Sequence, residues 1–214
     1  IAGRYDLLNR LLSVGIDRRW RRRTVELVPP VGDAPILDVC AGTADLALAY
    51  WRAGGGKVYV VGTDFCLPML RIGRDKCRRA GAGAQISLVE ADTLDLPFPD
   101  DSFQIVSVAF GLRNLADADA GLREMARVCR LGGRVAVLEF SHPTAWPLGK
   151  LYGWYFRRVL PIVGQALARN SQAAYNYLPN SVADFPQGEA LAERMRAAGL
   201  AEVQWHRFTW GVAT

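Results

Sequence analysis

Short apolar runs alternate along this chain with longer segments in which apolar residues recur at helical spacing. The runs predict strands over residues 36–40, 58–63, 86–90, 105–110, 134–140 and 202–208. The periodic segments predict helices from Asp45 to the glycines at 54–56, over 67–80, from Asp117 to Gly132, and over 188–198. This alternation predicts a single α/β domain over residues 1–214, with an open parallel sheet whose last strand, starting at 211, is cut short.

Two helices are predicted ahead of the sheet, within residues 1–30. Asp6 is placed to cap the first helix and Asp17 to cap the second. Along the second helix one stripe holds Trp20, Thr24 and Leu27. Its outer face is predicted to hold Arg18, Arg19, Arg21, Arg22 and Arg23. This cluster is a candidate contact for an anionic surface, and a solvated helix face without a partner explains it equally well.

The stretch 36–49 joins a strand, a turn of small residues and a helix. Small side chains in the turn, residues 41–44, leave the peptide groups uncovered, so a ligand can approach the backbone closely. Asp38 and Asp45 flank the turn, where a carboxylate repels a pyrophosphate and favours a ligand with positive charge, such as S-adenosylmethionine (SAM). A nicotinamide enzyme and a ligand-free α/β unit are the alternatives, although the GxGxxG spacing of dinucleotide sites is absent.

Further polar residues follow the strands at the edge where a parallel sheet binds ligands. Asp64 ends the second strand, at the position from which an acid binds ribose hydroxyls. Asp92 ends the third strand and either accepts a hydrogen bond from an adenine or caps a turn. The fourth strand leads into a polar loop, residues 111–117, of the kind that often carries catalytic groups. His142 follows the fifth strand and is either catalytic or structural.

Residues 143–180 break the alternation with an insertion rich in aromatic and basic residues. Between Leu148 and Val159 the apolar residues fall on one helical stripe, while Lys150, Arg157 and Arg158 can reach a polar surface. The pattern fits a lid over a lipophilic substrate, a helix on a membrane surface, or a helix buried on the sheet.

Composition narrows the class of protein. Half of the residues are hydrophobic, 22% are charged, the net charge is +5, and no apolar run is long enough to span a bilayer. The four cysteines lack metal-ligand spacing and lie within strand or helix patterns, as reduced core thiols of a cytosolic protein do. We therefore expect a soluble, cytoplasmic protein without a metal site, and no signal peptide is visible.

Four separated stretches point to one family. They are YDLLNRLLSVGIDRRW, ILDVCAGTAD, DLPFPDDSFQIVSVAFGLRN and RVCRLGGRVAVLEFSHP. Over nearly the whole chain they closely resemble the ubiquinone/menaquinone-biosynthesis C-methyltransferases of the UbiE/MenG type, with YDLLNRLLSVG and FGLRN the most specific. The resemblance implies a Rossmann-like class I methyltransferase fold, with a mostly parallel seven-stranded sheet covered by helices on both faces. It also implies SAM-dependent C-methylation of a prenylated quinol ring.

The resemblance assigns residues to the site. The substrate-side positions, where we expect catalytic groups, match Tyr5, Arg113 and Asn114. The family's cofactor contacts match Thr43, Asp64, Asp92 and Thr93. The full set of expected cofactor-binding residues is Asp38, Ala41, Gly42, Thr43, Asp64, Phe65, Asp92 and Thr93. Three departures from the pattern are Cys40 and Ala44, where glycines are common, and Ala109, where enzymes that serve both quinones can have serine.

The implied chemistry gives Arg113 a role. A quinol ring carbon becomes nucleophilic when a neighbouring hydroxyl loses its proton, so a group that stabilises the oxyanion helps. A guanidinium stays protonated and is a poor base. We therefore expect proton removal through a water oriented by Arg113, Asn114 or Tyr5.

The expected substrate is demethylmenaquinol, with the ubiquinone precursor or another small molecule as alternatives. A non-catalytic SAM- or RNA-binding protein is the alternative from another class. No aromatic stacking motif accompanies the arginines, so we expect no nucleic-acid partner. The aromatic and basic insertion suggests peripheral contact with the inner face of a membrane, and a homodimer is a further expectation.

Overall fold

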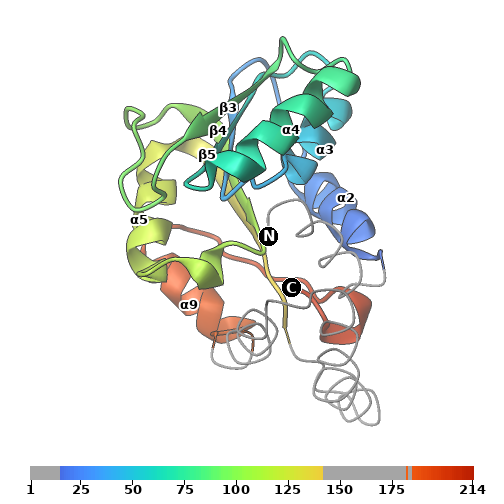
Figure 1. Ribbon diagram of the computed structural model, residues 1–214. Helices are drawn as coiled ribbons and strands as arrows, with labels where there is room; N and C mark the ends of the chain where they lie inside the picture. The colour runs from blue at the N-terminus through green and yellow to red at the C-terminus, as the bar shows by residue number, and fades with distance from the viewer. Residues whose placement is uncertain (1–14, 142–181, 183–184) are drawn as a thin grey trace.

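The computed structural model describes residues 15–141, 182 and 185–214, and a five-stranded parallel sheet forms its centre (Figure 1). The strand order is β3-β2-β1-β4-β5. The strands are β1 (Ile36–Val39), β2 (Val60–Asp64), β3 (Ile86–Glu90), β4 (Phe103–Ala109) and β5 (Cys129–Leu138). The order reverses between β1 and β4, and a sheet of this kind binds its ligand outside the carboxyl ends at that point. The predicted parallel α/β sheet and its first five strands are confirmed.

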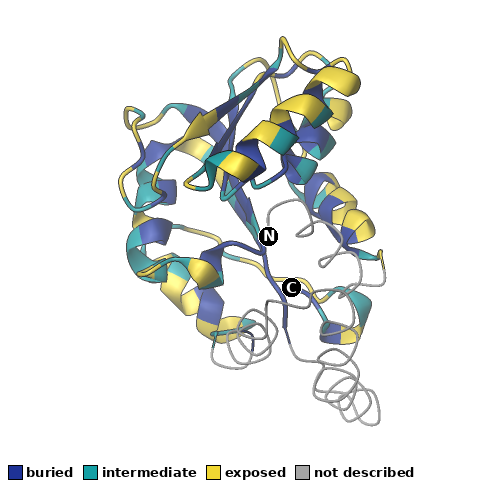
Figure 2. Cartoon of the chain, in the orientation of Figure 1, coloured by how far each residue is buried: buried dark blue, intermediate teal, exposed yellow. Residues whose placement is uncertain are grey.

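Helices cover both faces of the sheet (Figures 1 and 2). On one face lie α2 (Asp17–Leu27), α3 (Asp45–Ala53) and α4 (Leu67–Arg79). On the other lie α5 (Ala118–Val128) and α9 (Glu189–Ala197). Because strand residues alternate between faces, Ile36 joins the first buried cluster and Leu37 the second. The strands β1, β2 and β4, which are buried along their length, consist mostly of apolar residues, and the sequence pattern identified them for that reason.

The fifth strand begins earlier than predicted. Helix α5 ends at Val128, and β5 begins at once with Cys129 rather than at Arg134. The pairing with β4 shifts register between Cys129 and Arg134, so residues 130–133 bulge out. A Cβ on Gly133 would lie 2.8 Å from a backbone oxygen. The glycines predicted to end a helix instead permit this bulge.

Residues 202–208 do not form the predicted sixth strand. They lie largely exposed, and the Trp205 indole donates to the Glu189 carboxylate of α9 at 3.0 Å. The aromatic residue therefore packs on a helix instead of entering the sheet. Beyond it, Ala213 makes an isolated antiparallel bridge to Phe140. The described residues hold five of the seven expected strands.

Helix α2 matches its prediction in part. Trp20 and Thr24 are buried as expected. Asp17 is the first residue of the helix rather than its cap, and it is buried against Arg21, with 2.5 Å between carboxylate and guanidinium. Arg21 is therefore internal, and the other four arginines of the cluster are exposed. The predicted outer position of Arg21 was wrong, because a buried carboxylate one turn away pairs with it.

Some predictions lie outside the described residues. They concern the first helix with Tyr5, His142, and the insertion over 143–180. Within the described ranges, every helix is too short or too polar to traverse a bilayer.

Candidate functional site

The turn between β1 and α3 contains three residues with left-handed backbone. Cys40, Gly42 and Ala44 have φ values of 51°, 55° and 66°. Residues with side chains seldom adopt this conformation, and they keep it where the surrounding structure enforces it. The Ala41 amide donates to the Thr63 carbonyl at 2.8 Å, which fixes the turn to β2. The small-residue turn predicted to meet a ligand is therefore held rigidly at the carboxyl edge of the sheet.

Asp38 lies beneath this turn. Its side chain is buried, with 1% of the residue exposed, and it accepts hydrogen bonds from Ser107 Oγ and the Ala47 amide, both at 3.1 Å. Burial raises the pKa of Asp38 to about 7, against the opposing effects of the Ser107 hydroxyl, Arg21 and the Ala47 amide. Asp38 thus ties β1 to β4 and to the start of α3. A direct contact between Asp38 and the cofactor stays a prediction.

Asp45 is paired with a cation. Lys76 Nζ of α4 lies 2.7 Å from the Asp45 carboxylate and 2.8 Å from the hydroxyl of Thr43, which is buried. The lysine offsets one of the two acids that flank the turn, so Asp45 does not favour a cationic ligand in the way predicted. The network instead joins the turn to α4.

Asp64 is the last residue of β2 and contacts the turn after β1. One carboxylate oxygen accepts the Gly42 amide at 2.9 Å, and the other accepts the Cys66 amide at 2.8 Å. Partial burial raises the pKa of Asp64, and the two amides oppose that rise. Each oxygen has a second lone pair, so the carboxylate can still accept hydroxyl donors. The next residue, Phe65, is 72% exposed and offers an uncovered aromatic face beside the carboxylate.

Asp92 and Thr93 follow β3. The Asp92 carboxylate accepts the Leu94 amide at 2.9 Å, so it closes a turn, as one of the two sequence interpretations proposed. The side chain is also exposed and has acceptor sites left for a ligand. Thr93 is buried, and its hydroxyl lies 3.6 Å from the Cys40 sulfur. The end of β3 therefore meets the turn after β1.

The loop after β4 packs directly on the same turn. A Cβ on Gly111 would lie 2.4 Å from the Cys40 Cβ, so only glycine fits there. The preceding Phe110 is buried and left-handed, with φ of 62°. Residues Leu112–Asn114 then form a short 3-10 helix, η1. This close approach brings the loop with Arg113 and Asn114 against the turn expected to bind the cofactor.

Arg113 makes a buried ion pair with Glu139, which follows β5. The Nη1 atom lies 2.7 Å from Glu139 Oε2, and each side chain is 3% exposed. Nη1 also donates to the Phe110 carbonyl at 2.7 Å. The Asn114 amide group donates to the same carbonyl at 3.3 Å, and the residue is exposed. The sequence analysis did not assign Glu139 to the site; an acid at the carboxyl end of a strand was the available signal.

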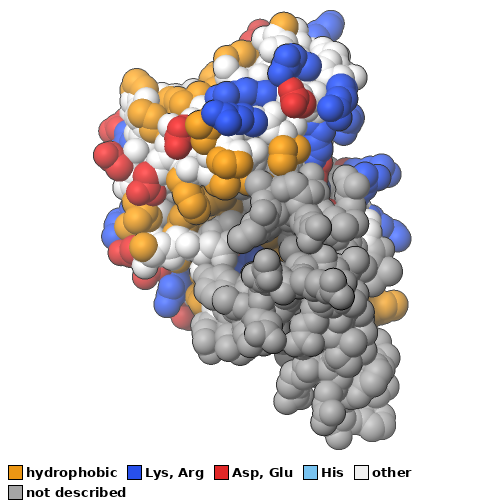
Figure 3. Space-filling view, in the orientation of Figure 1, with side chains coloured by type: hydrophobic (Ala, Val, Ile, Leu, Met, Phe, Trp, Pro, Cys, Tyr) orange, Lys and Arg blue, Asp and Glu red, His pale blue; other side chains and the backbone are white. Residues whose placement is uncertain are grey.

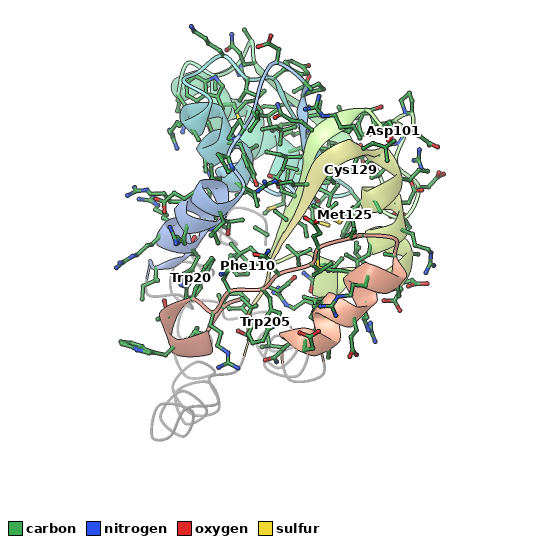
Figure 4. All side chains as sticks on the ribbon, turned by 180° about the vertical axis from the view of Figure 1, so that it is seen from behind. Trp20, Asp101, Phe110, Met125, Cys129 and Trp205 are labelled. Atoms are coloured by element: carbon green, nitrogen blue, oxygen red, sulfur yellow. The ribbon has the colours of Figure 1, made fainter. Side chains whose placement is uncertain are left out.

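Aromatic rings surround this ion pair. Phe110 and Phe140 have centroids 4.4 Å apart, and Trp20 of α2 lies about 6 Å from both, at 6.1 Å and 6.0 Å. The guanidinium of Arg113 lies over the Phe140 ring at 5.3 Å, and that of Arg21 over Phe110 at 5.2 Å. Figure 4 shows Trp20 and Phe110 where α2 meets the strand ends. The loop after β4 is thus anchored to α2 as well as to β5.

The described part of the predicted site therefore converges on one edge of the sheet. The turn, the strand-end acids and the Arg113 loop contact one another there. Two participants that the sequence analysis left out are Lys76 and Glu139, because each acts through a partner distant in the sequence.

Solved structures share this fold. A SAM-dependent methyltransferase from Thermotoga maritima matches with a TM-score of 0.58 and 18% identity, over 87% of this chain and 74% of that chain. One from Aquifex aeolicus matches with a TM-score of 0.55 and 17% identity, over 68% of this chain and 78% of that chain. The architecture is that of the class I methyltransferases.

Sequence comparison identifies the family. The model of the ubiE/COQ5 methyltransferase family matches residues 1–214, and the chain belongs to this family. It is 50% identical to the demethylmenaquinone methyltransferase of Thermus thermophilus, over 100% of this chain and 94% of that protein. It is 42% identical to the ubiquinone/menaquinone biosynthesis C-methyltransferase UbiE of Geobacter sulfurreducens, over 100% of this chain and 83% of that protein.

Proposed function

We propose that this protein is a SAM-dependent methyltransferase that methylates a ring carbon of a prenylated quinol, converting demethylmenaquinol to menaquinol. The observation that carries the proposal is the contact of Gly111 with Cys40, which sets the Arg113 loop against the small-residue turn. Substrate-side and cofactor-side residues are thereby neighbours. The preference for the naphthoquinol is supported by relatives named demethylmenaquinone methyltransferase, among them one at 50% identity.

The residues at the turn fit SAM. Position 42 of the turn is a left-handed glycine with no side chain to obstruct a ligand, and Asp64 keeps acceptor sites for the ribose hydroxyls beside the exposed Phe65. Asp92 keeps acceptor sites for an adenine amino group. When bound, SAM supplies an electrophilic methyl group. The residues proposed to hold it are Asp38, Ala41, Gly42, Thr43, Asp64, Phe65, Asp92 and Thr93.

Arg113 is proposed to act on the quinol. A guanidinium remains protonated, so it stabilises negative charge on a quinol oxygen rather than removing the proton itself. The side chain of Arg113 is 3% exposed, and burial strengthens such an interaction by keeping water away. Asn114 and Tyr5 are proposed to orient the water that takes the proton. An oxidised quinone has no hydroxyl to ionise, so only the reduced substrate is expected to react.

Peripheral contact with an anionic membrane is part of the proposal. Exposed arginines on α2 support it, together with basic residues of α4 that are also exposed (Figure 3). These residues are Arg18, Arg19, Arg22, Arg23, Arg71, Arg74, Arg78 and Arg79. A prenylated substrate resides in a bilayer, and basic side chains attract anionic lipids. The insertion over 143–180 is proposed to cover the tail.

A methyl-transfer assay under anaerobic reductant tests the function. The panel holds demethylmenaquinol, the ubiquinone-precursor quinol, and each of them with a shortened tail. We expect the highest kcat/KM with the full-length naphthoquinol. Burial of each tail CH₂ is worth about 0.8 kcal/mol, so shortening should raise KM. Absence of product with every quinol would overturn the proposal.

A further inference from the structure

Glu139 is a buried carboxylate whose hydrogen bonds converge on one arginine. Its Oε2 accepts Arg113 Nη1 at 2.7 Å, and its Oε1 accepts the Arg113 backbone amide at 3.3 Å. The Phe140 amide also donates to Oε2, at 3.2 Å. The backbone of Glu139 is fixed in turn by two 2.9 Å hydrogen bonds with Thr214. The backbone of Glu139 is therefore fixed just after β5, and its carboxylate accepts hydrogen bonds from both the side chain and the main chain of Arg113.

The ion pair between Glu139 and Arg113 is not explained by a contribution to the stability of the fold. Removing two charges from water is costly, and a buried ion pair often contributes no more than apolar side chains of similar volume. The pair does fix the direction in which the guanidinium points. Glu139 and the Phe110 carbonyl hold Nη1, and the Phe140 ring lies against the guanidinium.

A second observation concerns the Nε atom of Arg113, which lies on the other side of the guanidinium from Nη1. Arg113 Nε is buried and has no hydrogen-bond partner among the described residues. Buried donors without a partner are rare in folded proteins, and each one calls for an explanation. A buried, unpaired N–H group on the loop that packs against the turn is suited to an acceptor that arrives with the substrate.

We propose that Glu139 is a positioning residue of the methylation: it holds Arg113 by Nη1 so that Nε–H donates to the charged oxygen of the quinol. The inference rests on the proposed function, because that function provides the oxyanion. Glu139 itself does not touch the substrate and acts only through Arg113. Its removal should therefore matter only while Arg113 is present.

A double-mutant cycle measures this dependence. Glu139→Gln removes the negative charge but keeps the shape of the side chain and one acceptor oxygen for the guanidinium, so it is the preferred change; Glu139→Ala would remove every acceptor and leave a cavity. Each protein is measured for kcat, quinol KM, SAM affinity and thermal midpoint. We expect Glu139→Gln to lower kcat by at least about 10-fold, towards the roughly 10²-fold loss that a misplaced catalytic group can cause. In an Arg113→Ala background the same change should alter kcat by less than about 2-fold.

A matched control comes from α9. Glu189 pairs with Arg196 at 2.7 Å on the exposed surface, so Glu189→Gln makes the same charge change away from the site and should leave kcat unaltered. A spectroscopic readout avoids turnover altogether. The Nε–H signal of Arg113 should shift when a hydroquinone analogue is added to the wild type, and this response should be lost in Glu139→Gln.

The outcomes separate the inference from the function. The positioning role would be overturned if Glu139→Gln lowered kcat by the same factor in the wild type and in Arg113→Ala. It would also be overturned if the Nε–H signal responded equally in wild type and Glu139→Gln. A Glu139→Gln protein that stays folded but loses SAM affinity in proportion to kcat would also overturn it. Wild-type protein that methylates no quinol would overturn the proposed function instead.

Discussion

Replacing Asp64 by Asn tests cofactor binding with little disturbance of the fold. Asn keeps the shape but has one acceptor oxygen, so one of the amides of Gly42 and Cys66, at 2.9 Å and 2.8 Å, loses its acceptor. The residue is half-exposed, so water can replace that partner, and we expect a loss of about 1 kcal/mol in stability. For a chain of this size that lowers the thermal midpoint by about 2–4 °C.

The loss in binding should be larger than the loss in stability. Hydrogen bonds from ribose hydroxyls to a carboxylate are charge-assisted and contribute roughly 1.5–3 kcal/mol each. Losing one of them weakens SAM binding by at least about tenfold, which calorimetry resolves. Asp75→Asn is the control, because Asp75 is an exposed acid paired with Arg78 on α4.

Comparing ligands shows whether the ribose is the group that Asp64 holds. The wild type should bind S-adenosylhomocysteine more tightly than its 2′-deoxy analogue, and Asp64→Asn should largely lose that difference. Unchanged SAM affinity in Asp64→Asn would refute the assignment. So would an equal penalty for the deoxy analogue in both proteins.

Three further predictions concern the groups around the turn and α2. In the folded wild type Asp38 has a pKa of about 7 instead of the ordinary 3.8, so the folded state binds this proton more tightly than the unfolded state. The contribution of Asp38 to stability is therefore fully present below pH 3.8 and falls by about 4 kcal/mol as the pH rises to about 7. Asp38→Asn should remove this pH dependence. The same pH dependence of the unfolding free energy in variant and wild type across this range would contradict the prediction. Arg113→Ala should lower kcat by roughly 10²–10³-fold with SAM affinity kept, and Arg113→Lys should recover part of it; normal turnover would remove the residue from the mechanism. The free energy of binding to anionic liposomes, measured by sedimentation, should weaken by about 1 kcal/mol for each arginine of α2 changed to Gln, and neutral liposomes are the control. Retention on RNA instead of lipid would contradict the membrane contact. The arginines changed are Arg18, Arg19, Arg22 and Arg23.

The central strands β1, β2 and β4 were predictable because they are buried on both faces. Ile36 and Leu37 enter different clusters, so β1 is apolar at both positions and stands out in the sequence. The residues at the strand ends were predictable for a related reason. In a parallel sheet the carboxyl ends meet at one edge, and the acids Asp64 and Asp92 both lie there.

The features that were missed depend on contacts between distant residues. Nothing local in the sequence indicates that Arg21 lies over the Phe110 ring, or that Arg113 pairs with Glu139, which follows β5. Lys76 neutralises Asp45 from another helix, and no spacing rule reports such a contact. Residues 202–208 have strand composition, but composition does not say whether a neighbouring strand is free to pair.

The central claim is C-methylation of a reduced quinone ring, and the redox state of the substrate tests it most directly. Purified protein is given SAM and demethylmenaquinone in two parallel reactions, one under anaerobic reductant and one with the quinone kept oxidised. The loss of a proton from a quinol hydroxyl raises electron density on the ring carbon, whereas the carbonyls of the quinone withdraw it. We predict menaquinol as the product in the reduced reaction and no product in the oxidised one. Equal rates in the two reactions, or no product in either, would contradict the account.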